Sequence, residues 1–157
     1  MLNAAVRYGA TLVVMAVGDA LWLSFFARAV FRPTLGTILL DDVRWWAAIA
    51  FYLLFALGVT FFATTPAARQ GSWQIAVLYG ALLGFFGYMT YDLTNLATIK
   101  AWTTSLALMD IGWGTFLTAI AALAGYAAAR SDSRSCSLPP LSSTGRARRS
   151  RCSVSTN

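Results

Sequence analysis

Residues 45–65 read WWAAIAFYLLFALGVTFFATT, and no side chain in this stretch is charged. A helix of about 20 mostly apolar residues is long enough to cross the roughly 30 Å hydrocarbon core of a bilayer. Lipid offers no hydrogen-bond partners to the backbone, so a single apolar segment of this length is expected to be an α-helix. This stretch therefore predicts a membrane-spanning helix and decides the class of the fold.

Three further apolar stretches of similar length surround it, at about residues 8–30, 75–99 and 106–129. The whole chain is 58% hydrophobic and only 11% charged, whereas soluble domains carry about 25% charged residues. The alternating pattern of short barrel strands is absent. We therefore predict an all-α fold, a bundle of four transmembrane helices that forms one membrane domain over residues 1–130.

The first stretch has an alternative interpretation. Residues 1–7, the apolar run and the sequence Ala27-Arg28-Ala29 together have the layout of a secretory signal peptide with an A-x-A cleavage site. However, Asp19 would then lie inside the apolar region, and the run is longer than such regions usually are. We favour a retained helix.

The composition changes abruptly after the fourth stretch. Residues 131–157 contain five Arg, one Asp, many Ser and both cysteines, Cys136 and Cys152. Such a segment cannot bury a core, so we expect a disordered tail. The switch also resembles an out-of-frame extension, which makes a nonnative end an alternative. No metal site or disulfide is expected from two cysteines so placed without histidine.

Four spans put both termini on the same side of the membrane. The Lys and Arg count, once the tail is included, favours the cytoplasm for that side. The basic tail could hold anionic surfaces, but we predict no specific nucleic acid partner.

Three aspartates lie within the predicted spans: Asp19, Asp92 and Asp110. A carboxylate costs about 2.5–3.5 kcal/mol at the centre of a spanning helix, so each needs a reason to be there. The short connection at residues 100–105 makes the last two spans an antiparallel hairpin. Asp92 and Asp110 should therefore lie at similar depth and are able to face one another.

Other polar and small residues surround these carboxylates. Tyr88, Asp92 and Asn95 are spaced i, i+4, i+7 and share one helix face, with Tyr91 at its edge. Gly80 and Gly84 form a G-x-x-x-G pair that allows close helix packing, in this chain or in a dimer. A faint repeat relates Asp19-x-x-Trp22-x-Ser24-Phe25 to Asp110-x-x-Trp113-x-Thr115-Phe116. In each copy an indole N–H lies one turn from a carboxylate and can donate to one.

The string Tyr91-Asp92-Leu93-Thr94-Asn95-x-Ala97-Thr98, with the two D-x-x-W motifs around it, resembles a bacterial integral-membrane family, domain of unknown function 2177. The resemblance covers roughly residues 5–129. It implies a small four-helix inner-membrane protein with no established activity. The chain keeps the Trp that follows the third span in this family, Trp102, but lacks the Pro that usually accompanies it.

We predict that the polar residues form one intramembrane site for a proton, a cation or a small polar ligand. The predicted pocket comprises Asp19, Trp22, Tyr88, Tyr91, Asp92, Asn95, Asp110 and Trp113. The alternative is a non-catalytic accessory protein that binds lipid or a partner membrane protein, with these residues as structural cross-links. No catalytic residue, metal or cofactor is predicted, since the chain lacks His, Glu and a core Cys. A homo-oligomer through the Gly80/Gly84 face would suit transport.

Overall fold

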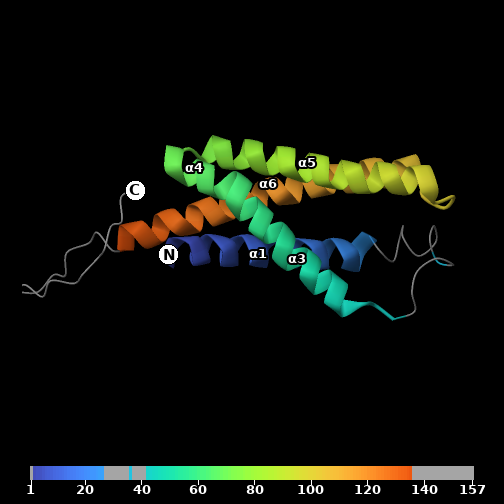
Figure 1. Cartoon of the computed structure of the whole chain (residues 1–157), viewed down its shortest axis with the longest axis horizontal. Helices are drawn as coiled ribbons and strands as arrows, with labels where there is room; N and C mark the ends of the chain where they lie inside the picture. The colour runs from blue at the N-terminus through green and yellow to red at the C-terminus, as the bar shows by residue number, and fades with distance from the viewer. Residues whose placement is uncertain (1, 27–35, 37–41, 136–157) are drawn as a thin grey trace, which may run out of the picture.

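The structure is a computed structural model that describes residues 2–26, 36 and 42–135 (Figure 1). Its elements are α1 (Leu2–Trp22), α3 (Trp45–Val59), the π-helical turn η2 (Thr60–Thr64), α4 (Thr65–Gln70), α5 (Trp73–Thr98) and α6 (Thr104–Ser135). A further π-helical turn continues α1 over residues 23–26. The described ranges contain no strand. The all-α prediction is confirmed.

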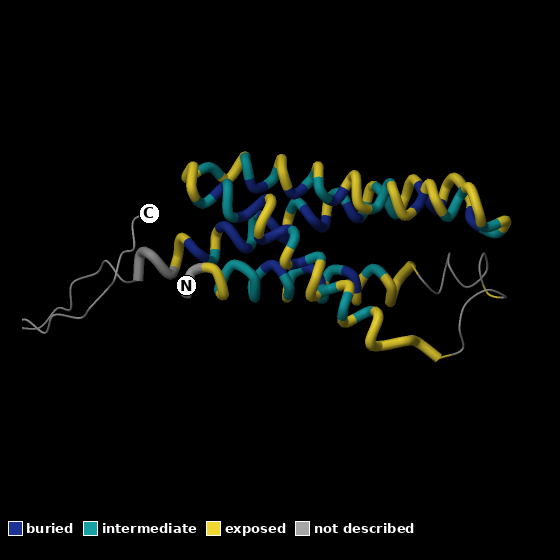
Figure 2. The backbone as a smooth tube through the Cα atoms, in the orientation of Figure 1, coloured by how far each residue is buried: buried dark blue, intermediate teal, exposed yellow. Residues whose placement is uncertain are grey.

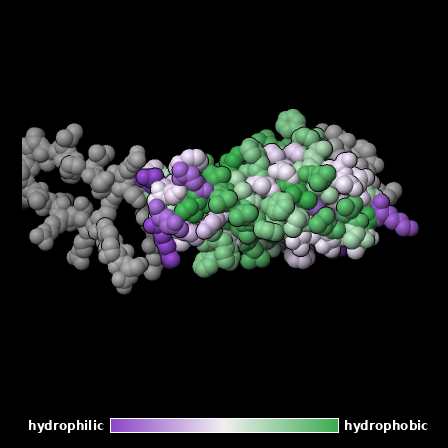
Figure 3. All heavy atoms as spheres, turned by 90° about the horizontal axis from the view of Figure 1, so that it is seen from above, coloured by the Kyte–Doolittle hydropathy of each residue, from purple (hydrophilic) through white to green (hydrophobic). Residues whose placement is uncertain are grey.

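Four of these helical segments are long and apolar enough to cross a membrane: Ala4–Phe26, Trp45–Gln70, Trp73–Thr98 and Thr104–Ser131. They correspond to the four predicted spans. The molecular surface supports the same conclusion, because an apolar band crosses the visible face and hydrophilic residues lie toward its two ends (Figure 3). The bilayer is therefore the environment of this chain.

Helix α6 is the centre of the bundle. It has its most extensive contacts with α5 and its next most extensive with α1, while α3 packs mainly on α1. Figure 2 shows the buried residues on the sides where these helices face each other. The start of α1 and the end of α6 lie at the same end of the molecule (Figure 1), as a four-span topology requires.

Small residues set the close approach of α5 to α6. A Cβ atom on Gly80 would come within 2.7 Å of the Ala122 Cβ, and one on Gly84 within 2.6 Å of the Gly114 carbonyl oxygen. These distances are shorter than van der Waals contact, so only glycine fits. The face that we suggested for a dimer is therefore covered by α6 of the same chain.

The second span differs from its predicted end. The apolar stretch that predicted this span ends at residue 65, but the helix continues through Pro66 to Gln70 and turns only at Gly71, whose φ is 65°. Pro66 has no N–H to donate and its ring crowds the preceding turn. The wider turn η2 lies just before it, and the Thr64 and Thr65 hydroxyls both donate to the Thr60 carbonyl, at 2.9 and 2.8 Å.

The C-terminal boundary also differs. Helix α6 runs to Ser135, so the first five residues of the expected disordered tail continue the helix instead. The rest of that tail, with Cys136 and Cys152, lies outside the described residues. So does the sequence 27–29 on which the signal-peptide alternative depends, and so do residues 27–30 of the first predicted span.

Tryptophans at the span ends behave in two ways. Trp45, Trp46 and Trp73 are 70%, 72% and 53% exposed, which suits an aromatic belt at the membrane surface. Trp102 also follows a span, but it is not exposed in this way. Trp102 is only 7% exposed and packs with Leu106 and Ala107 at the turn between α5 and α6.

Candidate functional site

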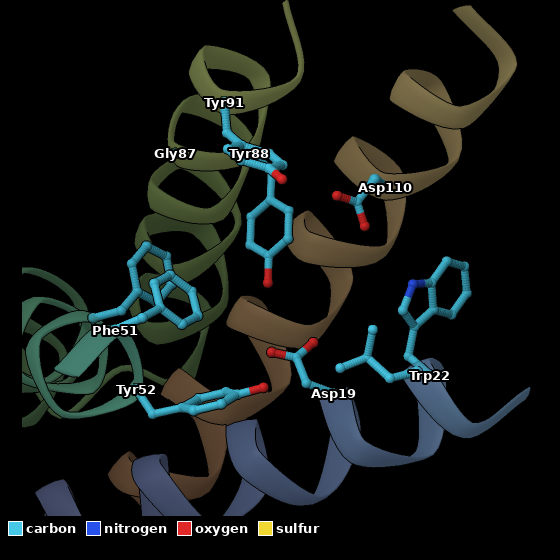
Figure 4. Close-up of a pocket in the computed structure, with 10 residues that line it drawn as sticks. Asp19, Trp22, Phe51, Tyr52, Gly87, Tyr88, Tyr91 and Asp110 are labelled. Atoms are coloured by element: carbon cyan, nitrogen blue, oxygen red, sulfur yellow. The ribbon is translucent and has the colours of Figure 1, made fainter. Parts of the chain in front are cut away.

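A cavity of about 560 Å³ lies among α1, α3, α5 and α6 (Figure 4). This volume is within the range of about 300–1,000 Å³ that is usual for small-molecule sites. The lining residues are mostly aromatic, with two carboxylates: Asp19, Trp22, Leu23, Phe51, Tyr52, Phe55, Gly87, Tyr88, Tyr91 and Asp110. No Arg or Lys of the described ranges is among them, so the lining carries acidic groups without basic ones.

Asp19 is the deeper and better satisfied of the two carboxylates. It is 7% exposed, and its Oδ1 accepts a hydrogen bond from the Trp113 indole N–H at 3.3 Å. The hydroxyls of Tyr52 and Tyr88 point toward the same carboxylate from α3 and α5 (Figure 4). Asp19 thus links α1 to α6 by a hydrogen bond and lies beside tyrosines of α3 and α5.

Asp110 is in a different situation. Its carboxylate lines the cavity from α6, near Trp22 and opposite Tyr88 in Figure 4. Within the part of the chain that the structure describes, it has no hydrogen-bond or ion-pair partner. An unpaired carboxylate inside a spanning segment is costly. Among the groups that line the cavity, the Asp110 carboxylate would therefore gain the most from a ligand that supplies a hydrogen-bond donor or a positive charge.

The two D-x-x-W motifs meet at this site. The indoles of Trp22 and Trp113 are stacked, with ring centroids 4.6 Å apart and planes at 8°. Phe26 also stacks on the Trp22 indole, with ring centroids 3.9 Å apart. The buried Trp22 Nε1 has no hydrogen-bond partner among the described residues, which leaves a second polar group unsatisfied beside the cavity.

Gly114 positions the Tyr88 ring. A Cβ atom at Gly114 would clash with three carbons of that ring, so the ring lies directly against the α6 backbone. On its other side, Tyr88 meets Phe55 of α3 edge-to-face, with centroids 6.3 Å apart. The ring is held between two helices, and its hydroxyl is directed into the cavity (Figure 4).

The outer rim of the cavity lies among lipid-facing residues. Leu23 is 49% exposed, Phe51 43% and Tyr91 55%, and Gly87 is also exposed. Helix α5 contacts η2 and α4 but has no comparable contact with α3. The second span thus approaches α5 at one end and diverges from it along α3, where these rim residues lie.

Asp92 does not belong to this cavity. It is fully buried, and its Oδ1 accepts a hydrogen bond at 3.2 Å from the Trp102 indole N–H at the turn. Its Oδ2 has no hydrogen-bond partner among the described residues. The cavity lining thus includes Asp110 and not Asp92, and a single site that contains both carboxylates stays a prediction. The hydrogen-bond partner of Asp92 is Trp102, which follows the third span.

The rest of the predicted polar face is also divided. Asn95 is half-buried but does not line the cavity. The hydroxyls of Thr90, Thr94 and Thr98 each donate to the carbonyl four residues before them, at 2.6–2.8 Å. The hydrogen bonds of these threonine hydroxyls therefore stay within α5 and do not connect it to another helix.

The structure thus brings together five predicted pocket residues, Asp19, Trp22, Tyr88, Tyr91 and Asp110, and places Trp113 directly behind them. Sequence reasoning missed the contribution of α3, whose Phe51, Tyr52 and Phe55 line the other side. Tyr52 carries the single hydroxyl group in the first half of the second span, and that was the available signal. No group of three metal-ligating side chains occurs in the described ranges.

Four spanning helices around a mostly aromatic cavity with two carboxylates define a small integral membrane protein. The family model described as "Predicted membrane protein (DUF2177)" matches residues 4–127, and the chain belongs to this family. No curated protein and no solved structure matches the chain.

Proposed function

We propose that this protein binds a cationic or amine-bearing small ligand in the cavity, as a resident of the bacterial inner membrane with both termini in the cytoplasm. One observation carries the proposal. The Asp110 carboxylate faces a cavity that is large enough for a small molecule, and it has no partner among the described residues. A positively charged ligand would supply the missing partner.

The rest of the lining supports the same type of ligand. Aromatic faces attract cations that lie within about 6 Å of the ring centroid, most strongly where water is excluded. Trp22, Tyr52 and Tyr88 present such rings beside the two carboxylates. The volume of about 560 Å³ exceeds what a bare ion needs, which favours an organic ammonium group over a metal ion. The same arrangement would serve a binding protein or one step of a transporter.

The test is binding of ethylammonium to the purified full chain in nanodiscs. We expect saturable binding to the wild type and at least about tenfold weaker binding to Asp110→Asn, since a hydrogen bond to a charged group is worth about 1.5–3 kcal/mol. Asp42→Asn is the matched control, because Asp42 is exposed and precedes the second span. Equal binding by the wild type and Asp110→Asn would sink the proposal.

A second candidate function has its own support. The hydrogen bonds Trp113–Asp19 and Trp102–Asp92 are the type of contact by which polar residues hold a membrane bundle together. On this hypothesis the chain is an accessory protein that binds lipid or another membrane protein, and the carboxylates are structural. It predicts that Asp110→Asn changes thermal stability but no ligand binding, while a partner co-purifies with the wild type.

A further inference from the structure

We infer that the ligand of this cavity is an amphiphile that enters sideways from the bilayer, with a protonated amine as its head and its hydrocarbon tail in lipid. This inference deepens the proposed function and rests on it. It specifies the source of the amine and the route into the site.

The position of the cavity gives the first reason. Asp19 lies seven residues before the end of the first span and Asp110 six residues after the start of the fourth, so both are about 10 Å inside at a rise of about 1.5 Å per residue. A water-soluble cation would have to lose its hydration shell and cross this depth of hydrocarbon. An amphiphile that is already in the leaflet can reach the cavity by lateral diffusion within the bilayer.

The mouth gives the second reason. The exposed rim residues Phe51, Gly87 and Tyr91 lie within spanning segments of α3 and α5, where the molecular exterior is lipid. The second span packs closely on α5 at η2 and α4, whereas along α3 the backbones diverge and Phe55 alone reaches Tyr88 of α5, edge-to-face. Gly87 adds no side chain on the α5 side of the rim, and a Cβ there would lie 3.3 Å from the Phe55 ring, so Phe55 borders the mouth at this point. A hydrocarbon tail can therefore extend from the cavity into the bilayer between α3 and α5.

Charge gives the third reason and fixes the head group. Two carboxylates line the cavity, and neither Arg nor Lys of the described ranges does. A phosphate or carboxylate head would be repelled and would find no basic partner there. The unpartnered Asp110 carboxylate can only accept hydrogen bonds. A protonated amine donates them and brings the complementary charge.

The experiment uses three probes on the full chain in phosphatidylcholine nanodiscs: dodecylammonium, ethylammonium and dodecanol. Bound probe is measured by native mass spectrometry. We expect dodecylammonium to bind saturably at a total concentration at least about a hundredfold below that needed for ethylammonium, because the tail concentrates it in the bilayer where the mouth opens. Dodecanol, which has the tail but no charge, should not bind saturably.

Two variants make the result specific. Asp110→Asn should weaken dodecylammonium binding by at least about tenfold, and Asp42→Asn should not. Gly87→Leu places a side chain in the mouth and replaces glycine by a good helix former, so it should reduce dodecylammonium binding in a protein that still folds. It should reduce ethylammonium binding less.

The possible outcomes separate this inference from the function on which it rests. If ethylammonium binds as tightly as dodecylammonium, entry from the bilayer is wrong and the amine site stands. If dodecanol binds as well as dodecylammonium, the site recognises the tail and the amine assignment is wrong. If neither amine binds, both the inference and the proposed function are wrong.

Discussion

Trp113 of α6 donates its indole N–H to the Asp19 carboxylate of α1 across 3.3 Å. The donor belongs to one D-x-x-W motif and the acceptor to the other. The two motifs lie on α1 and α6, the first and last helices of the bundle. Their indoles stack with ring centroids 4.6 Å apart. The faint repeat in the sequence therefore has a structural correlate, because its two copies are in direct contact beside the cavity.

Replacing Trp113 by Phe should remove the hydrogen bond while keeping an aromatic ring for the stack on Trp22. We expect the free energy of unfolding in bicelles to fall by about 1 kcal/mol, within the range of about 0.6–1.7 kcal/mol measured for polar contacts between membrane helices. Trp45→Phe is the matched control, since Trp45 is 70% exposed. Equal effects of both changes would mean that the Trp113–Asp19 bond contributes nothing to stability.

The four spans could be predicted from hydropathy because lipid imposes one requirement on every segment, an internally bonded apolar helix of fixed minimum length. The ends were harder to predict. The predicted second span ended at residue 65, yet the η2 turn and the threonine hydroxyls that bond to Thr60 let the helix continue through Pro66. That compensation depends on local geometry, which hydropathy does not report.

Residues of the candidate site could be predicted only where a polar side chain stands out within an apolar span. Asp19 and Asp110 stood out because carboxylates are rare in spans. Asp92 is absent from the lining, and its Oδ1 accepts a hydrogen bond from Trp102, which folds back from the turn. Distance along the sequence does not show this contact. Phe51 and Phe55 were missed because an aromatic side chain that lines a cavity and one that faces lipid look alike in sequence.

Gly114 and Gly112 offer a matched pair on α6. A Cβ at Gly114 would clash with the Tyr88 ring, whereas a Cβ at Gly112 meets nothing within 4 Å. We expect Gly112→Ala to stabilise the protein by about 0.5–1 kcal/mol, the usual gain in a helix interior. Gly114→Ala should instead destabilise it by about 1–3 kcal/mol, the usual cost of overpacking.

The same pair tests the site. Gly114→Ala displaces the Tyr88 ring and should weaken ethylammonium binding, while Gly112→Ala should leave it unchanged. Unfolding free energies in bicelles and binding in nanodiscs are the two measurements. A Gly114→Ala protein with both values unchanged would show that the Tyr88 ring moves aside without consequence.

Asp92 and Asp110 should differ in what their replacement changes. Because Asp92 lies outside the cavity and accepts from Trp102, Asp92→Asn should leave ethylammonium binding within about twofold of the wild type. Trp102→Phe should lower the free energy of unfolding by about 1 kcal/mol through loss of that donor. If Asp92→Asn abolished binding, the division of the polar residues into two groups would be wrong.

Protons should compete with the ligand at Asp110. The cation and the proton both neutralise the same carboxylate, and the protonated form has lost its charge and one acceptor. The affinity for ethylammonium should therefore fall as the pH is lowered, by up to about tenfold per pH unit once the carboxyl group is mostly protonated in the free protein.

This competition is checked by titrating ethylammonium into nanodiscs at a series of pH values. Asp42→Asn should reproduce the wild-type dependence, since its carboxyl group is exposed and outside the cavity. Asp110→Asn should bind more weakly where Asp110 is ionised in the wild type and approach the wild-type affinity at low pH, with a shallower slope set by Asp19 alone. If Asp110→Asn kept the full slope, Asp19 rather than Asp110 would be the carboxylate at which protons and the ligand compete, and the Trp113–Asp19 hydrogen bond would then have to break each time a ligand enters.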